Sequence, residues 1–168
     1  MTYRQKIFIS YHEADQDYKD QLEGMLVGNY EVLSSQSFDS GLFSGSSDID
    51  QLNAIRKAYL EDSILTIVLV GQVSAFHKNI DWEIASSLSQ TYFCKRSGLM
   101  GIRLPFEQGN CNRVPVRLKD NISNGYAALY QWNNDWFFLE QWIKRAMKTR
   151  HKNADNHRKL PTISEMAA

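Results

Sequence analysis

The chain has 168 residues, of which 43% are hydrophobic and 23% charged, so it is long enough and apolar enough to bury the core of one domain. Its 19 basic residues balance its 19 acidic residues, and the absence of a basic excess argues against nucleic-acid binding. The longest apolar run, Ile64–Val70, has the length of a strand and is too short to span a membrane.

The sequence carries no sign of an export signal or of a metal site. The N-terminal residues run directly into a strand pattern, without the apolar segment of a signal peptide. Cys94 and Cys111 are isolated cysteines with no spacing typical of metal ligands. We therefore expect a cytoplasmic protein that binds no metal ion and is not attached to a membrane.

Strand and helix patterns alternate from the N-terminus onward. Lys6–Ser10 predicts a short buried strand, and the polar turn behind it leads into a helix. Tyr30–Leu33 predicts a weaker strand, and a loop rich in Ser and Gly follows over Ser34–Ser47. Ser47 and Asp50 resemble a capping box that starts a second helix. That helix is expected to turn five side chains toward the core: Ile49, Leu52, Ile55, Tyr59 and Leu60.

The middle of the chain predicts a central strand and a helix behind it. Ile64–Val70 is apolar throughout, which is typical of a strand buried on both faces of a parallel sheet. The next helix is expected from about Asn79 to Cys94, with a core-facing stripe at Ile80, Ile84, Leu88 and Tyr92. Trp82 and Glu83 then fall in its first turn, and Glu83 lies away from the stripe, so we expect it not to face the core.

The last part of the chain predicts two more strands and one helix. Leu99–Leu104 is the fourth expected strand, and Ala127–Trp132 is the fifth, at an edge of the sheet. Between them we expect a loop over Phe106–Leu118. The final helix is expected from about Asn134 to Thr149. From residue 150 onward the chain is polar, and we expect a weakly held tail.

Strands that alternate with helices predict an α/β fold with a parallel sheet covered on both faces. Right-handed crossovers favour a flavodoxin-like, five-stranded sheet in a three-layer arrangement. We expect one domain over residues 1–149, followed by a polar C-terminal tail over residues 150–168.

Ligands of such sheets bind at the carboxyl ends of the strands. The aromatic, acidic and hydroxyl residues expected at that edge are Ser10, Tyr11, His12, Asp39, Phe43, Trp82 and Glu83. Several of the candidate residues also have a purely structural interpretation. A Glu in the first turn of a helix is commonly solvated, and Trp82 and Phe8 both suit a core. Asp39 suits a turn, and His12 suits a loop. Composition and spacing thus indicate one candidate pocket and leave its chemistry open.

Several standard motifs are missing. No glycine-rich phosphate loop follows the first strand, and no nucleophile elbow is present. A phosphate-accepting response regulator would need an Asp at the end of the third strand, where this chain has Gly71. These absences exclude the best-known functions of flavodoxin-like folds, which the fold alone does not assign.

Six segments in succession do resemble a known family. They are Lys6–His12, Phe38–Phe43, Ile67–Gly71 with Asp81–Ile84 behind it, Gly101–Pro105, Val114–Asn121 and Leu129–Trp132. In this order and spacing they are similar to the TIR-like domain family, and in particular to the TIR-like protein of Thoeris anti-phage defence systems. The resemblance extends from about Lys6 to Trp142.

The resemblance implies an enzyme that consumes NAD as a substrate and keeps no permanently bound cofactor. It implies that Glu83 is the catalytic residue, which acts on the bond between nicotinamide and ribose. It further implies that Phe8, Ser10, Tyr11 and Asp39 line the NAD pocket, with Trp82 in the wall beside Glu83. The expected product is an ADP-ribose-type signal, hydrolysed, cyclic or conjugated, that activates a separate effector protein during phage infection.

An alternative from a different functional class is a non-catalytic TIR-like interaction module that acts by self-assembly. The presence of Glu83 favours the enzyme, because an adaptor has no need of a carboxylate at that position. Self-association is compatible with both interpretations.

Overall fold

The computed structural model describes residues 3–34, 47–60, 62–90, 95–106 and 113–162. Five parallel strands form one sheet in the order β2-β1-β3-β4-β5. The strands are β1 (Lys6–Ser10), β2 (Glu31–Ser34), β3 (Ser63–Val70), β4 (Gly98–Arg103) and β5 (Ala128–Gln131). This order confirms the predicted flavodoxin-like fold, with β5 at an edge and β1 in the interior of the sheet.

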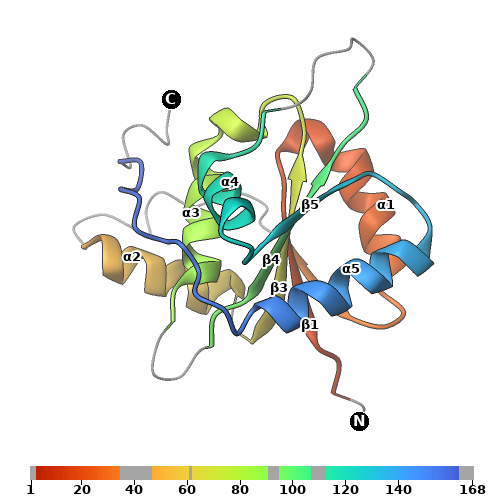
Figure 1. Ribbon diagram of the computed structural model, residues 1–168, viewed down its shortest axis with the longest axis horizontal. Coiled ribbons are helices and arrows are strands. Elements are labelled where there is room, and N and C mark those ends of the chain that lie inside the picture. The colour runs from red at the N-terminus through yellow and green to blue at the C-terminus, as the bar shows by residue number, and fades with distance from the viewer. Residues whose placement is uncertain (1–2, 35–46, 61, 91–94, 107–112, 163–168) are drawn as a thin grey trace.

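Helices cover both faces of the sheet (Figure 1). They are α1 (Gln16–Leu26), α2 (Asp48–Ile55), α3 (Lys78–Leu88), α4 (Val116–Ser123) and α5 (Trp136–Thr149), with the short helices η1 (Glu13–Asp15), η3 (Arg56–Leu60) and η4 (Ser74–Phe76). The helices α1 and α5 lie on one face, while α3 and α4 lie on the other, with α2 packed against α3. The three layers follow from the alternation of strands and helices along the chain.

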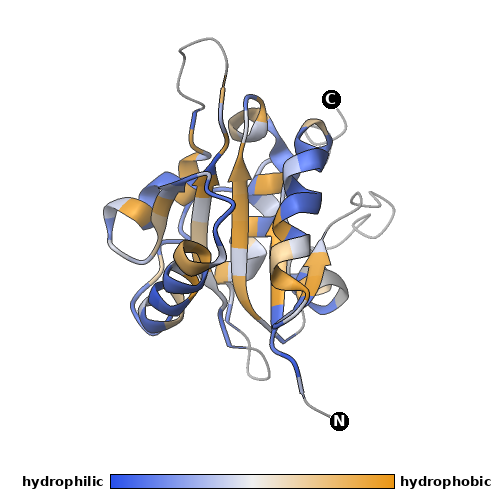
Figure 2. Cartoon of the chain, turned by 90° about the vertical axis from the view of Figure 1, so that its right-hand side faces the viewer, coloured by the Kyte–Doolittle hydropathy of each residue, from blue (hydrophilic) through white to orange (hydrophobic). Residues whose placement is uncertain are grey.

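The core has one cluster on each face of the sheet, because side chains alternate along a strand. Ile7, Ile67 and Met100 point toward α1 and α5, whereas Val68 and Leu99 point toward α3 and α4. Figure 2 shows the hydrophobic strands enclosed by helices whose outer surfaces are hydrophilic. The apolar run of β3 is thereby explained, since this central strand is buried on both faces.

The predicted start of the second helix is confirmed, and one of its expected core contacts is wrong. The capping box is present: the Ser47 hydroxyl lies 2.7 Å from Asp50 Oδ2, and the Asp50 N–H donates back to Ser47 Oγ over 3.3 Å. The prediction that Ile49 faces the core is wrong, because 70% of Ile49 is exposed in the first turn of α2. Leu60 is fully buried as predicted. The side chains of Leu52, Ile55 and Tyr59 lie outside the described residues.

Two helix boundaries differ from the prediction. The helix α3 ends at Leu88, since Ser89 takes an extended conformation and its N–H bonds to the carbonyl oxygens of Ala85 and Ser86. Tyr92, assigned to the same stripe, lies outside the described residues. The expected loop Phe106–Leu118 and the segment after it contain α4, which begins behind Pro115. Its eight residues are too few and too polar to give a clear helical pattern in the sequence.

The C-terminal segment is held more firmly than predicted. We call residues 150–162 the C-terminal segment; it runs along α3 and α4 (Figure 1). Side chains of both helices hydrogen-bond to its backbone, as for Trp82 to Pro161 and Asn121 to Asp155. The expectation of a weakly held tail is therefore wrong for these residues. None of the helices in the described ranges is both long enough and apolar enough to cross a membrane.

Candidate functional site

The end of β1 places two of the predicted site residues on the face of the sheet that α3 covers. Phe8 and Ser10 share this face by alternation, while Ile7 and Ile9 belong to the α1–α5 side. Both Phe8 and Ser10 are fully buried. Because β1 pairs with β2 on one side and β3 on the other, Ser10 lies at the carboxyl edge of an interior strand, where ligands of such sheets bind.

Glu83 of α3 meets Ser10 at this edge. The Ser10 hydroxyl donates a hydrogen bond to Glu83 Oε2, and only 2% of Glu83 is exposed. The prediction that Glu83 points away from the core is therefore wrong. The physical reason is that the sheet, α2 and α4 all contact α3, so every residue from Trp82 to Leu88 is buried, whichever side of the helix it occupies.

The position of Glu83 along α3 also differs from the prediction. The helix begins at Lys78 with His77 as its N-cap, so Glu83 is in the second turn, and Asp81 is the acidic residue of the first turn. The effect of a helix dipole falls off within the first turn. The hydrogen bond from Ser10 therefore orients the carboxylate more effectively than the helix dipole does.

Buried hydroxyl groups continue the polar contacts between α3 and the sheet. Thr66 Oγ1 of β3 lies 2.6 Å from Ser87 Oγ, and Ser87 Oγ donates to the backbone oxygen of Glu83 over 2.9 Å. Such paired groups allow one arrangement of a helix on a sheet, because a shift would leave them buried without partners. They fix the position of α3, and with it the position of Glu83.

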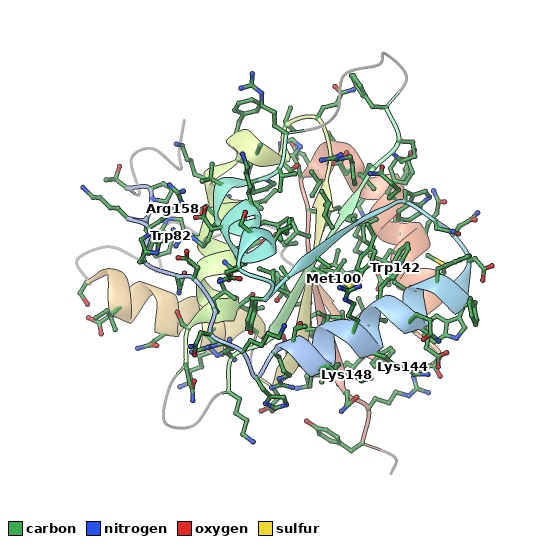
Figure 3. All side chains as sticks on the ribbon, in the orientation of Figure 1. Trp82, Met100, Trp142, Lys144, Lys148 and Arg158 are labelled. Carbon is green, nitrogen blue, oxygen red and sulfur yellow. The ribbon has the colours of Figure 1, made fainter. Side chains whose placement is uncertain are left out.

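Trp82 is buried on a different side of α3. Its indole N–H donates to the Pro161 carbonyl oxygen over 2.9 Å. Successive helix positions are about 100° apart, so Trp82 and Glu83 leave the helix in different directions. Figure 3 shows Trp82 near Arg158, on the side of α3 that the C-terminal segment covers. The structure thus places the indole N–H of Trp82 against the C-terminal segment, and the place of Trp82 in the wall beside Glu83 stays a prediction.

The other predicted pocket residues have mixed outcomes. Tyr11 follows Ser10 and is half-buried, and its hydroxyl donates to Gln16 Oε1 over 2.9 Å. Asp39 and Phe43 lie outside the described residues. Phe8, Ser10 and Glu83 therefore form the part of the predicted pocket that the structure brings to one face.

A second polar cluster at the same edge was not singled out from the sequence. It consists of Asp15, Gly71 and His77, with His12 beside them. The rings of His12 and His77 meet edge-on, with centroids 4.7 Å apart and planes at 73°. Burial raises the pKa of Asp15 against the opposing effect of His12, and it lowers the pKa of His77, as His12 also does. The sequence signal was the place of Gly71, directly after the apolar strand β3.

The described residues hold no group of three or more His, Cys, Asp or Glu side chains that could bind a metal ion. At Ser10, one hydroxyl group is paired with one carboxylate, that of Glu83. The chemistry available at this edge is that of two carboxyl groups, Glu83 and Asp15, a hydroxyl and two imidazoles.

The fold defines a class. A five-stranded parallel sheet in the order 2-1-3-4-5 with helices on both faces is the flavodoxin-like arrangement that TIR-like α/β domains have. The chain matches the family model of the Thoeris protein ThsB, TIR-like domain, over residues 8–109. This match covers more than half of the 168 residues, and the chain belongs to this family. The comparison with curated proteins gave no match.

The matched residues contain both Ser10 and Glu83. The helices α4 and α5, the strand β5 and the C-terminal segment lie beyond them. The contacts that α3 makes with Pro161 and with α4 therefore involve parts of the chain outside the match.

Proposed function

We propose that this chain is an NAD-consuming enzyme that cleaves the bond between nicotinamide and ribose, with Glu83 as the catalytic residue. The observation that carries the proposal is the buried contact between the Ser10 hydroxyl and the Glu83 carboxylate. It lies at the carboxyl edge of an interior strand, in a chain whose family resemblance implies NAD processing.

The chemistry requires stabilisation of a developing positive charge. Cleavage of the nicotinamide–ribose bond has an oxocarbenium-like transition state, as in glycoside hydrolysis. A carboxylate held beside the ribose favours that state more than the ground state, and fixed electrostatic groups of this kind contribute about 2.7–4 kcal/mol. The Ser10 hydroxyl holds Glu83 Oε2 in one orientation, so that the carboxylate does not need to reorganise during the reaction.

The NAD pocket proposed around Glu83 uses Phe8, Ser10, Tyr11 and Asp39. Phe8 and Ser10 belong to the same face of β1 as the contact with Glu83, and Tyr11 begins the loop behind it. NAD is the substrate, and no resident cofactor takes part. Trp82 supports α3 through its hydrogen bond to Pro161.

The product proposed for this enzyme is an ADP-ribose-type nucleotide, which serves as a signal in anti-phage defence. Such a signal acts on a separate effector protein, so the two proteins are linked through the nucleotide. The family match to a Thoeris protein supports this role.

The test is mass spectrometry of NAD and its products in cells that express the protein during phage infection. The wild-type chain is compared with Glu83→Gln, and with Glu13→Gln as a matched control, because Glu13 is an exposed glutamate at the same edge. We expect NAD loss and a new ADP-ribose-type product with the wild type and with Glu13→Gln, but not with Glu83→Gln. Identical nucleotide profiles for all three folded proteins would contradict the proposal.

A non-catalytic interaction module is the second candidate function. The observation that favours it is the 2% exposure of Glu83, since a buried, hydrogen-bonded carboxylate is also found in purely structural roles. On this interpretation Glu83→Gln leaves NAD unchanged and lowers the stability of the fold. Measuring thermal unfolding beside the nucleotide profile therefore separates the two functions.

A further inference from the structure

The second polar cluster at the carboxyl edge contains two side chains, Asp15 and His77, with a buried polar atom that no described residue pairs. We call Asp15, Gly71, His12 and His77 the Asp15–His77 cluster. Asp15 ends η1 behind β1, Gly71 follows β3, and His77 precedes α3. Since β1 and β3 are neighbours in the sheet and α3 carries Glu83, the cluster belongs to the same edge as the proposed catalytic residue.

Asp15 is held against the backbone of Gly71. An added Cβ at position 71 would collide with the Asp15 carboxylate, so only glycine permits this approach. Asp15 stands at the N-cap of α1, yet its side chain makes no capping hydrogen bond. Its Oδ2 atom is buried and has no hydrogen-bond partner among the described residues. Buried acceptors without a partner are rare, and binding of a ligand or a role in catalysis is one physical reason for them.

His77 repeats this pattern. It is the N-cap of α3, and its side chain makes no capping hydrogen bond. Its Nδ1 atom is buried and without a hydrogen-bond partner in the described part of the chain. The neighbouring His12 is different, because its Nδ1 accepts the Ala14 N–H over 3.1 Å. Two N-cap side chains at one edge thus leave a polar atom unused by the helices they precede.

The environment restricts the chemistry of a ligand. Burial raises the pKa of Asp15 and lowers the pKa of His77, so in each case it disfavours the charged form. A phosphate group would bring negative charge next to the Asp15 carboxyl. A neutral group that both donates and accepts hydrogen bonds can satisfy Asp15 Oδ2, or His77 Nδ1 in either tautomer. Hydroxyl and carboxamide groups have this property.

The geometry points to the Asp15–His77 cluster as a binding subsite for a neutral, hydroxyl- or carboxamide-bearing part of the substrate, with Asp15 and His77 as its hydrogen-bonding residues. The inference rests on the proposed function for the identity of that substrate as NAD. The two sources of such groups in NAD are its ribose diols and its nicotinamide carboxamide. An acidic side chain that binds ribose hydroxyls is also used by other dinucleotide-binding folds.

The test uses the imidazole NMR signals of the full-length protein. The chain has four histidines; His12 and His77 are in the cluster, whereas His151 and His157 are exposed in the C-terminal segment and serve as internal controls. The probes are ADP-ribose, which carries the ribose diols but no carboxamide, nicotinamide, which carries the carboxamide but no diol, and inorganic diphosphate, which matches the anionic part of ADP-ribose. We expect the His12 and His77 signals to shift with ADP-ribose or with nicotinamide, which identifies the source, and not with diphosphate.

The variant Asp15→Asn keeps the shape of the side chain and removes the carboxylate. We expect it to weaken binding of the responding probe by about tenfold or more, whereas Asp17→Asn, the same change at an exposed aspartate of α1, leaves binding unchanged. We also expect its unfolding temperature to stay equal to that of the wild type or to rise, because no hydrogen bond to Asp15 Oδ2 is lost. A lower unfolding temperature together with unchanged binding would show a structural role and overturn the inference.

The remaining outcomes separate this inference from the proposed function. If the wild type consumes NAD while the signals of His12 and His77 ignore all three probes and Asp15→Asn has the wild-type KM, the subsite is overturned and the enzyme stands. If no NAD is consumed but ADP-ribose or nicotinamide shifts those two signals, the subsite stands and the proposed reaction is overturned. A shift with diphosphate alone would also contradict the subsite, because it would indicate an anion site.

Discussion

The helix α3 has two polar surroundings that differ in how completely they are satisfied. Toward the C-terminal segment, the Arg117 guanidinium donates to both carboxylate oxygens of Asp81 over 2.8 and 3.0 Å, and to Asn156 Oδ1 over 3.0 Å. Toward the carboxyl edge of the sheet, Asp15 and His77 each keep a buried atom without a partner among the described residues.

On the side of α3 that faces the C-terminal segment, the paired hydrogen-bonding groups form a structural network. Asn121 and Asp155 exchange two hydrogen bonds of 2.8 Å each, between the amide side chain of one and the backbone of the other. Arg117 is 1% exposed and reaches from α4 to α3 and the C-terminal segment at once. Buried polar networks of this kind stabilise a fold when every member is paired.

This difference between the two sides of α3 indicates where a functional site lies in the molecule. A fold can fully pair the polar groups that it needs for stability, as it does around Arg117. Unpaired buried atoms lower stability, so Asp15 Oδ2 and His77 Nδ1, at the same edge of the sheet as Ser10 and Glu83, are candidates for another task.

Replacing Arg117 should have the largest effect on stability. Arg117→Ala leaves Asp81 without its bidentate partner and frees the C-terminal segment from two hydrogen bonds. Removing one member of a buried ion pair costs about 3–5 kcal/mol. Urea unfolding should show this loss, with Lys119→Ala as control, because Lys119 is an exposed cation on the same helix. A loss as small as that of Lys119→Ala would show that the network does not stabilise the fold.

Replacing Glu83 should have the largest effect on chemistry. Glu83→Gln keeps the shape of the side chain and can still accept the hydrogen bond from Ser10, so the free energy of unfolding should change by only about 1 kcal/mol. The rate of NAD cleavage should fall by about 10²–10³-fold. Purified protein with NAD, followed by the release of nicotinamide, checks this rate. Equal rates in the two proteins would move the catalytic group away from Glu83.

Replacing Trp82 should have a moderate effect on stability. Trp82→Phe keeps an aromatic ring beneath the C-terminal segment but removes the indole N–H that bonds to Pro161. The lost hydrogen bond should cost about 1 kcal/mol, plus the effect of the smaller ring. Hydrogen exchange should increase in the C-terminal segment and much less in β3. A change in NAD cleavage with unchanged exchange would instead place Trp82 in the pocket.

Replacing Asp15 should have the smallest effect on stability, with the opposite sign. The pKa of Asp15 is raised in the folded protein above its ordinary value of 3.8. Folding therefore favours the protonated side chain, and Asp15 contributes favourably to the free energy of unfolding below pH 3.8. This contribution is lost as the pH rises through the higher pKa of the folded protein. Asp15→Asn removes this loss. The unfolding temperature of the variant should exceed that of the wild type by up to about 2 °C near neutral pH, and the difference should vanish in acid. A difference that grew toward low pH would contradict this sign.

The sequence by itself determined the architecture. The apolar run Ile64–Val70 predicted a strand buried on both faces, the alternation of strands and helices predicted a parallel sheet, and the pairing of Ser47 with Asp50 predicted a helix start. These features depend on residues close together in the chain, whose periodicity and capping chemistry act locally. The motifs shared with the TIR-like family likewise predicted Glu83 as a site residue.

Only the tertiary structure decided the surroundings of Glu83. Ser10 and Glu83 are 73 positions apart in the chain, and the helical stripe alone placed the carboxylate away from the core. That inference failed because α3 is covered on more than one side, by the sheet, α2, α4 and the C-terminal segment. A one-sided stripe describes a helix with one buried face, and the number of buried faces depends on which distant segments pack against it.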